Sequence, residues 1–554
     1  MNRREFLVSG AAATAIGTAL PAPGIAAPLG LAAGLGPGPA NSDFLAIAQQ
    51  AIPILRETVE HPLRIVQPLA SPGLALRYAM QADGTAADIA GRDLNAGDSL
   101  ILDFGGHRTG HLSFRVETTG RAPDSPGRIR LTFGEVPTDV AEPLRPYKGQ
   151  LSESWLPDDV VSIDNLPQTY FHPRRHAFRY VRIDVLGLST KFALRLQDVA
   201  VKAVTAAQRI PPALVSGNEL DRTIDTVSIA TLRDCLQTVF EDGPRRDQRL
   251  WIGDLRLQAL ANYATFGAND VVKRCLYLFA GLPRQDGLVN ACIYEKPIPR
   301  SASIVLLDYA ALFNVTLQEY VEATGDLATG RDLLPIALRQ LALLGRCVGN
   351  DGLFVPPPGI AQFIDWQPVL DKVTAVQGVL IMAYERTLRL ARKLGLEHLA
   401  DGYPATIARM RKAARNAWFD KERGLFVSGP QRQISWASQA WMVLAGVPTS
   451  RHEAATALRR VLALDPAIKP KTPYLYHYMV EAMLVADMRD EALALVRSYW
   501  GGMIHGGADT FWEVYDPEQP LSSPYGDIHI NSYCHAWSCT PTYFYRARAL
   551  LGVG

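Results

Sequence analysis

One stretch of the sequence gathers carboxylates and arginines immediately before an apolar helical pattern. Residues 242–256 read DGPRRDQRLWIGDLR and contain Asp242, Asp247 and Asp254 among four arginines. Closely packed acids raise the pKa of at least one of them, as a general acid requires, while neighbouring arginines keep the others ionised. The alternative is a salt-bridged helix entrance, with the aspartates near the positive end of the helix dipole.

A second stretch surrounds a glutamate with aromatic rings. Residues 508–516 read ADTFWEVYD, in which Phe511, Trp512 and Tyr515 flank Glu513. These rings would give the carboxylate low-dielectric walls, as is typical of a reactive carboxyl group. The alternatives are an exposed glutamate on a helix turn, or a neighbouring aspartate in the role of base.

Two carboxyl groups and aromatic rings together indicate chemistry on a sugar. Breaking a glycosidic bond requires one carboxylic acid to protonate the leaving oxygen and one carboxylate to activate water or attack carbon. Aromatic rings pack against the C–H faces of a pyranose, and carboxylates accept its hydroxyls. Further loops carry the same residue types, and from them we expect substrate contacts from Asp365, Trp366, Trp436, Tyr474 and His535.

The composition narrows the class of partner. The 554-residue chain carries 56 basic and 55 acidic residues, so its net charge of +1 creates no field that would attract nucleic acid or an anionic membrane. The six cysteines are scattered and show no Cys-x-x-Cys spacing, which argues against a metal site and favours buried free thiols. We therefore expect no metal and no cofactor.

The N-terminus has the features of an export signal. MNRREFLVSGAAATAIGTAL contains the pair Arg3 and Arg4 followed by a mildly apolar run, with small residues near Ala26 suitable for cleavage. This pattern predicts a twin-arginine signal peptide over residues 1–27 and a periplasmic or secreted protein. A buried N-terminal helix is the alternative.

Two further segments precede the helical part of the chain. Residues 28–61 read as a Gly/Pro-rich linker and a short helix, which we expect Ser42 to cap and which extends to about Glu57. From 62 to 208, apolar and polar residues alternate with period two, as at Leu112, Phe114 and Val116. Alternation without long helical patterns predicts a β-sandwich.

The pattern becomes helical over residues 209–554. We expect about twelve apolar helical segments, beginning near residues 217, 253, 268, 304, 329, 373, 397, 433, 451, 473, 487 and 535. They are joined alternately by short turns and longer polar loops, which favours helical hairpins arranged as an (α/α)6 barrel. Helix count alone does not distinguish this barrel from a solenoid. In a ring of hairpins every second loop lies at the same end, where the aromatic and acidic loops could line one pocket.

Several motifs resemble those of the α-L-rhamnosidases of glycoside hydrolase family 78 and their six-hairpin relatives. DGPRRDQRLWIGD resembles the acidic catalytic loop of that family, TFWE the segment carrying its base, and SYCHAWSCTPTY its last barrel helix. LDFGGHRTGHLSF and HAFRYVRI are similar to the β-sandwich that precedes the barrel. The resemblance covers roughly residues 85 to 550.

The resemblance implies roles for individual residues. Asp247 would be the general acid and Glu513 the general base acting through water, while Asp242 and Asp254 would hold sugar hydroxyls. Arg246, Trp251 and Trp512 would also contact the substrate. Many relatives carry glutamate where Asp247 stands, so this side chain is one methylene shorter than in those enzymes.

The expected protein is an inverting exo-glycosidase that releases terminal α-L-rhamnose, or a similar sugar, from a carbohydrate substrate. It would act without a metal or cofactor, as a monomer or homodimer that contacts neither nucleic acid nor membrane. One alternative is a different glycosidase, or a polysaccharide lyase, on the same barrel. Another is a non-catalytic periplasmic sugar-binding protein, which would need neither a proton donor nor a water-activating base.

Overall fold

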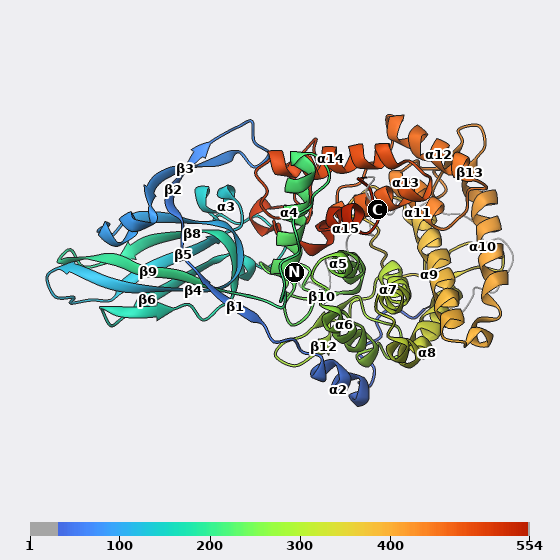
Figure 1. Ribbon diagram of the computed structural model, residues 1–554, viewed down its shortest axis with the longest axis horizontal. Coiled ribbons are helices and arrows are strands. Elements are labelled where there is room, and N and C mark those ends of the chain that lie inside the picture. The colour runs from blue at the N-terminus through green and yellow to red at the C-terminus, as the bar shows by residue number, and fades with distance from the viewer. Residues whose placement is uncertain (1–30, 552–554) are drawn as a thin grey trace, which may run out of the picture. The chain divides into compact units, whose positions relative to one another are not determined.

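A computed structural model describes residues 31–551, so the predicted signal peptide at 1–27 lies outside the described residues. The described chain forms two compact units. We call residues 53–248, 264–268 and 496–551 the β-rich unit, and residues 31–52, 249–263 and 269–495 the helical unit. Figure 1 colours the chain by residue number, from blue near the N-terminus through green and yellow to red near the C-terminus.

Antiparallel strands build most of the β-rich unit. They are β1 (Arg56–Glu60), β2 (Arg64–Ala70), β3 (Tyr78–Thr85), β4 (Ser99–Gly120), β5 (Gly127–Gly134), β6 (Asp158–Ile163), β7 (Gln168–Phe171), β8 (His176–Gly187) and β9 (Phe192–Thr205). The order is β1-β9-β4-β8-β5-β6, with β2 and β7 also paired to β4 and β3 paired to β2. The first half of β4 pairs with β8 and its second half with β9.

The period-two alternation explains the core of these strands. Leu112, Phe114 and Val116 all lie in one buried cluster with side chains from β5, β8 and β9. Inward-facing residues of neighbouring strands thus pack together while their polar neighbours face out. The predicted β-sandwich architecture, with antiparallel strands around an apolar core, is confirmed.

The short N-terminal helix differs from its prediction. Asn41, rather than Ser42, caps α2 (Ser42–Gln50), because its side chain accepts hydrogen bonds from the backbone N–H groups of Asp43 and Phe44. The helix ends at Gln50. Residues 51–55 form a turn and an irregular segment, and β1 begins at Arg56, just before the predicted helix end at Glu57. The apolar spacing beyond Gln50 was therefore misread as helical.

Twelve helices follow the strands within the described residues. They are α4 (Glu219–Cys235), α5 (Ile252–Ala264), α6 (Asn269–Gly281), α7 (Leu307–Thr324), α8 (Leu327–Leu344), α9 (Val373–Lys393), α10 (Tyr403–Trp418), α11 (Trp436–Leu444), α12 (Arg451–Ala463), α13 (Pro473–Val485), α14 (Arg489–His505) and α15 (Pro541–Arg546). Helices α9, α12 and α13 begin at the predicted residues 373, 451 and 473. Helices α10 and α15 begin later, because the short 3-10 turns at Glu397–Ala400 and Ala536–Ser538 come first.

The helical unit is built from hairpins. Helix α7 packs against α9, α9 against α11, and α11 against α13, while α8, α10 and α12 pack beside them (Figure 1). Because each of these outer helices returns the chain, α7, α9, α11 and α13 all begin at the same end of the unit. The segments at the N-terminal ends of α9, α11 and α13 carry the predicted residues Asp365, Trp366, Trp436 and Tyr474.

Two further expectations concern chemistry and membranes. All six cysteines lie among the described residues, are buried and form no disulfide, as predicted. Within residues 31–551 no helix is both long and apolar enough to cross a membrane.

Candidate active site

The catalytic-loop segment, residues 242–248, is a tight turn in the β-rich unit. Its backbone is closed by a 3.1 Å hydrogen bond from Gln248 N to Gly243 O, and Ala536 N donates to Asp242 O at 2.9 Å. A Cβ atom at Gly243 would lie 2.6 Å from Ser532 Oγ and 3.0 Å from Cys534 O. Glycine is therefore required for the turn to approach residues 532–536 closely.

Arg245 attaches this turn to the strands. Its guanidinium donates to both oxygens of Asp139, in α3 (Pro137–Ala141), and to the carbonyl of His529 at 2.7 Å, and it lies 3.5 Å from Glu135. From the sequence, the arginines of this loop are expected to keep its own aspartates ionised, whereas Arg245 contacts Asp139, Glu135 and the carbonyl of His529. Arg245 thus anchors the turn.

Arg246 joins the two predicted catalytic carboxyl groups. Its Nη2 lies 3.1 Å from Oε2 of Glu513, and its Nε lies 3.4 Å from Oδ1 of Asp247. Guanidinium nitrogens are linked by two C–N bonds of about 1.3 Å each, so these two carboxylate oxygens are no more than about 9 Å apart. The structure therefore brings Asp247 and Glu513 into one site.

Glu513 is held through both its side chain and its backbone. The hydroxyl of Tyr525 donates to Oε1, and Ser532 N lies 3.4 Å from Oε2. The backbone N–H of Glu513 donates to Ser532 O at 2.9 Å, while the indole N–H of Trp537 donates to Glu513 O at 3.0 Å. With both Glu513 and Tyr525 buried, these contacts fix the carboxylate in a low-dielectric setting.

The guanidinium of Arg246 is itself strongly stabilised in its charged form. Burial alone would lower its pKa, but the negative charge of Glu513, and after it that of Asp247, raises the pKa of Arg246 well above its ordinary value. Its guanidinium also lies 4.4 Å from the centre of the Tyr525 ring. The positive charge between the two carboxyl groups is therefore permanent.

His535 and Trp512 both lie within this unit. Burial, aided by the nearby charge of Arg246, holds the pKa of His535 well below its ordinary value despite the opposing charge of Asp247, so the ring is neutral. Trp512 is buried edge-on against Tyr515 and Tyr533, at ring-centre distances of 5.5 and 5.7 Å. Among the described residues no acceptor meets its indole N–H.

A buried network of charged side chains includes Glu135, which lies 3.5 Å from Arg245 of the 242–248 turn. His107 on β4 contacts Asp234 at the end of α4 at 2.7 Å and Glu135 at 3.1 Å. Burial opposes the charged imidazole, but Cys534, Asp234 and Glu135 together raise the pKa of His107 well above its ordinary value. Because Glu135 also accepts from Tyr533 N at 2.7 Å, the network connects β4, α4 and the C-terminal loop.

The helical unit collects a second group of predicted residues around Tyr309 and Phe363. The Tyr309 hydroxyl lies 3.3 Å from Oδ2 of Asp254, and its ring meets Trp251 edge-on at 6.4 Å. Tyr474 lies 6.0 Å from the ring of Tyr309. Phe363 contacts Tyr309, Trp366 and Tyr474 at ring-centre distances of 5.3 to 5.5 Å.

Asp365 and Trp436 occupy the same end of the helical unit. Asp365 accepts from the backbone N–H groups of Gln367, Lys471 and Thr472 and from the Thr472 hydroxyl, so it ties its loop to the start of α13. Burial raises the pKa of Asp365 to about 6. Trp436, the first residue of α11, packs edge-on against Tyr476 at 5.7 Å.

The predicted site residues therefore fall into two groups. The β-rich unit holds Asp242, Arg246, Asp247, Trp512, Glu513 and His535, and the helical unit holds Trp251, Asp254, Asp365, Trp366, Trp436 and Tyr474. Tyr525, Tyr309 and Phe363 were missed. Tyr309 lies in the first turn of α7, as Trp436 and Tyr474 lie in the first turns of α11 and α13, so this shared position is a signal that the sequence carries. No spacing in the 519–526 loop singles out Tyr525.

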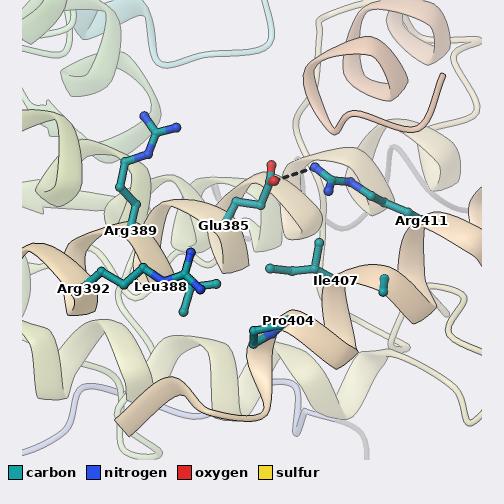
Figure 2. Close-up of a pocket in the computed structure, with 8 residues that line it drawn as sticks. Glu385, Leu388, Arg389, Arg392, Pro404, Ile407 and Arg411 are labelled. Carbon is teal, nitrogen blue, oxygen red and sulfur yellow. Dashed lines mark hydrogen bonds and ion pairs between the residues drawn. The ribbon is translucent and has the colours of Figure 1, made fainter. Parts of the chain in front are cut away.

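A cavity of about 380 Å³ lies elsewhere in the helical unit, between α9 and α10 (Figure 2). It is lined by Glu385, Leu388, Arg389, Arg392, Pro404, Ile407, Ala408 and Arg411. No aromatic ring and none of the predicted site residues is among these, and Glu385 is paired with Arg411. This cavity is not the candidate active site.

Comparisons with known proteins agree with the fold. The model of the glycosyl hydrolase family 78 alpha-rhamnosidase N-terminal domain matches residues 62–203, and that of the bacterial alpha-L-rhamnosidase 6 hairpin glycosidase domain matches residues 361–548. A rhamnosidase from Klebsiella oxytoca, solved with rhamnose bound, is 42% identical, with a TM-score of 0.89 over 92% of this chain and 99% of that one. No curated protein sequence matches the chain.

More distant structures share the fold alone. A family 78 rhamnosidase of Bacillus sp. GL1 is 23% identical with a TM-score of 0.68, and the present chain spans only 46% of its length. A Streptomyces avermitilis α-L-rhamnosidase complexed with L-rhamnose is 18% identical with a TM-score of 0.65, over 44% of its length. Those enzymes are about twice as long as this chain.

The fold and the two matched domains define a glycoside hydrolase with a six-hairpin domain. At 42% identity over nearly the whole of the Klebsiella enzyme, the relationship extends well beyond a shared fold. The chain belongs to glycoside hydrolase family 78, the α-L-rhamnosidases.

Proposed function

We propose that the protein is an inverting exo-glycosidase that releases terminal α-L-rhamnose, with Asp247 as general acid and Glu513 as general base. Family membership supports the reaction class, and a bound rhamnose is described for the Klebsiella enzyme. The observation that carries the assignment of residues is the bridge from Arg246 to both carboxyl groups.

In the proposed reaction both carboxyl groups act in one displacement. Asp247 donates its proton to the glycosidic oxygen as the bond from the anomeric carbon breaks. Glu513 takes a proton from the water that attacks the opposite face, so the products are the free aglycone and the sugar of inverted configuration. The pair ends with Asp247 ionised and Glu513 protonated, and exchange with solvent restores the starting state.

Inversion is proposed from the family, and the separation of the two carboxyl groups is the distance that distinguishes inversion from retention. Inverting enzymes hold their carboxyl groups about 6.5 to 9.5 Å apart, because water must fit between the base and the sugar, whereas retaining enzymes hold them about 5 to 5.5 Å apart. The limit of about 9 Å set by the Arg246 contacts is compatible with the inverting range. Arg246 and Tyr525 would orient the base towards the water.

Other residues of the β-rich unit are proposed to hold the substrate. Asp242 precedes the acid in the same turn and would accept a sugar hydroxyl. The charges of Arg246 and Asp247 both act on the pKa of His535, so its imidazole lies near them. Because this imidazole is neutral, it can donate or accept one hydrogen bond. The packing of Trp512 between two tyrosines favours a role as a wall of the base rather than as a stacking platform.

The aromatic group of the helical unit is proposed to bind sugar. Asp254 would accept a hydroxyl alongside its contact from Tyr309, and Trp251, Trp366, Trp436 and Tyr474 would offer ring faces or indole N–H groups. Buried indole N–H groups of Trp251 and Trp436 meet no acceptor among the described residues, as expected for donors that serve a ligand. Asp365 would act indirectly, by holding the loop that carries Trp366.

The experiment compares the wild-type protein with Glu513→Gln and a matched control, Glu518→Gln, on an aryl α-L-rhamnoside. Glu518 is exposed in the same loop. We expect Glu513→Gln to lose hydrolysis with the fold intact, Glu518→Gln to turn over normally, and NMR of the first wild-type product to reveal β-L-rhamnose. Wild-type turnover by Glu513→Gln would refute the assignment of the base, and α-L-rhamnose as first product would refute inversion.

Two alternatives would give different results. A lyase would release an unsaturated uronic acid, visible as a rise in ultraviolet absorbance, and no free rhamnose. A sugar-binding protein would bind rhamnose in calorimetry and give no product after prolonged incubation. The presence of both Asp247 and Glu513 in one site favours hydrolysis over either.

We also propose that the protein reaches the periplasm or the medium through the twin-arginine route. Arg3, Arg4 and the apolar run after them support this, although they lie outside the described residues. Six buried free thiols suit a protein that folds in a reducing compartment before export.

A further inference from the structure

Three side chains of the β-rich unit bring their ligand atoms to one point. Asp159 lies on β6, His172 directly follows β7, and His176 begins β8. The Nε2 atoms of the two histidines and Oδ2 of Asp159 form a triangle in which every side measures 3.1 Å. The group is apart from the carboxyl groups of the proposed reaction, and it fills no role there.

We propose that Asp159, His172 and His176 form a binding site for a divalent transition metal ion, with Zn²⁺ as the ion that best suits the ligand set. Two imidazoles and one carboxylate are common zinc ligands, with bond lengths of about 2.0 to 2.2 Å. An ion about 2.1 Å from all three atoms would subtend ligand–metal–ligand angles of about 95°. Such angles leave at least one coordination position to water.

Hydrogen bonding alone accounts poorly for this triangle. Each imidazole N–H lies in its ring plane and points in one direction, so Nε2 of His172 cannot direct one proton at both Asp159 and His176. If both Nε2 atoms carry protons, two donors face each other at 3.1 Å. A cation resolves the conflict, because all three atoms then direct lone pairs at a single centre.

The surroundings resemble those of a metal ligand set. Nδ1 of His172 lies 3.1 Å from the Tyr170 hydroxyl, which can accept its N–H and so leave Nε2 free of a proton. The ring of His176 is stacked on Phe133 at 3.7 Å with an interplanar angle of 6°, which fixes its orientation. Arg174 pairs with Oδ1 of Asp159 at 2.6 Å, so Asp159 would bind through Oδ2 alone.

The exposure of the three ligands indicates where solvent reaches the ion. The side chains of His172 and His176 are 2% and 7% exposed, and that of Asp159 is 22% exposed. A water ligand would therefore enter from the side of Asp159. A buried histidine pair with one open face is typical of three protein ligands completed by water.

The spacing of the histidines could have revealed this site. The turn reads HPRRH, an H-x3-H spacing that recurs in zinc sites. The proposal departs from the expectation of no metal, which rests on the spacing of the cysteines. The proposed ion takes no part in the catalytic reaction.

The ion would have a structural consequence for the catalytic turn. Arg175 lies inside HPRRH, and its Nη2 contacts both carboxylate oxygens of Glu241, at 2.7 and 2.8 Å. Glu241 directly precedes Asp242. An ion bound to His172 and His176 would fix both ends of HPRRH and so hold Arg175 in place. We infer that the ion stabilises the β-rich unit at the point where the chain enters the 242–248 turn.

The test uses the full-length protein, stripped with a chelator and then titrated with Zn²⁺. Wild-type protein should take up one equivalent of Zn²⁺ by metal analysis, and its Tm should rise by about 2–4 °C or more, because the ion binds the folded state. Asp159→Asn and His176→Gln should lose both the uptake and the shift. His452→Gln, which changes an exposed histidine on α12, should behave as wild type.

The outcomes separate the proposal from folding defects and from loose binding. Circular dichroism of the stripped variants confirms that they fold, and Asp159→Asn preserves the size of the side chain. Co²⁺ in place of Zn²⁺ should give wild-type protein visible absorption bands that both variants lack. Less than one tenth of an equivalent of Zn²⁺ in wild type, or equal uptake by Asp159→Asn, would overturn the site whether or not the protein hydrolyses rhamnosides.

Discussion

Nη2 of Arg246 lies 3.1 Å from Oε2 of Glu513. Through this contact, the turn that carries Asp247 also determines where the second carboxylate lies. The adjacent Arg245 binds Asp139 and the carbonyl of His529, so neighbouring arginines have separate tasks. Arg245 fixes the turn to the β-rich fold, and Arg246 aligns the two carboxyl groups.

This division of roles predicts that replacement by lysine lowers kcat at Arg246 and lowers Tm at Arg245. Arg246→Lys keeps the charge but loses the planar fork that contacts both carboxyl groups, so kcat should fall about 10- to 100-fold with little change in Tm. Arg245→Lys should lower Tm and leave kcat of the folded fraction nearly unchanged. Steady-state kinetics and thermal melts of both variants test this, and equal effects on kcat would contradict it.

The hydroxyl of Tyr525 is predicted to matter for catalysis and not for folding. It donates to Oε1 of Glu513, and a hydrogen bond to a charged group contributes about 1.5–3 kcal/mol, so Tyr525→Phe should lower kcat about 10- to 100-fold. Tyr384→Phe is the matched control, because that buried hydroxyl donates to the backbone carbonyl of Leu341. It should lower Tm slightly and leave kcat unchanged.

Much of the fold could be predicted because it follows from local periodicity. Leu112, Phe114 and Val116 alternate with polar residues and lie in the sheet core, and α9, α12 and α13 begin at the predicted residues. Failures occurred where local signals were ambiguous. Asn41 and Ser42 are both good caps. The helix stops at Gln50, shortly before Pro53, which disfavours helix at its own position and at Ile52, and Arg56–Glu60 then pairs with β9.

The site was predictable to the extent that its chemistry lies in short motifs. Asp247 and Glu513 stand out by their neighbours in sequence, whereas Tyr525 and Glu135 do not. Glu135 meets Tyr533 only because a strand end and a C-terminal loop come together in three dimensions. Pairings between residues hundreds of positions apart leave no local pattern in a single sequence.

The buried histidine His107 predicts a loss of stability at alkaline pH. Its pKa is raised above the ordinary 6.5 in the folded protein, so its contribution is complete below about pH 6.5 and disappears as pH rises through the folded pKa. Asp234, whose pKa is lowered from 3.8 to about 2 against the cost of burial, contributes above about pH 4 and loses its effect near pH 2. The attraction between the charged forms of His107 and Asp234 is therefore strongest between about pH 4 and pH 6.5.

Thermal melts between about pH 6 and pH 10 measure this effect. Wild-type Tm should fall with rising pH more steeply than that of His107→Gln, which lacks the titrating ring. His107→Gln should also be less stable near neutral pH by about 3–5 kcal/mol, because Asp234 and Glu135 would stay buried without their partner. Parallel curves for the two proteins would remove His107 as the source of the pH dependence.

The N-terminal arginine pair predicts the route of export. Replacing both Arg3 and Arg4 with lysine should leave the protein in the cytoplasm, because twin-arginine recognition depends on the guanidinium pair. Enzyme assays and immunoblots of periplasmic and cytoplasmic fractions measure the distribution. Undiminished periplasmic activity in the double variant would show that the pair is not needed.

Asp247→Asn separates the proposed acid from every other role of this turn. A general acid contributes about 10²- to 10⁴-fold when the leaving group needs a proton. The variant should therefore lose about that much kcat/KM on an alkyl α-L-rhamnoside and far less on a dinitrophenyl rhamnoside, whose acidic phenol departs unprotonated. A uniform loss on both substrates would assign Asp247 to substrate binding, because a binding contact acts on the rhamnose common to both.

The same pair of substrates tests the length of the side chain at this position. Asp247→Glu adds the methylene that many relatives carry, and the turn has little room to move because Arg245 and the close contact at Gly243 fix its backbone. If the sugar is held to suit the shorter acid, the extra methylene displaces the carboxyl group from the glycosidic oxygen. The alkyl rhamnoside should then again suffer more than the dinitrophenyl one, whereas improved turnover of the alkyl substrate would mean that aspartate is too short for its task.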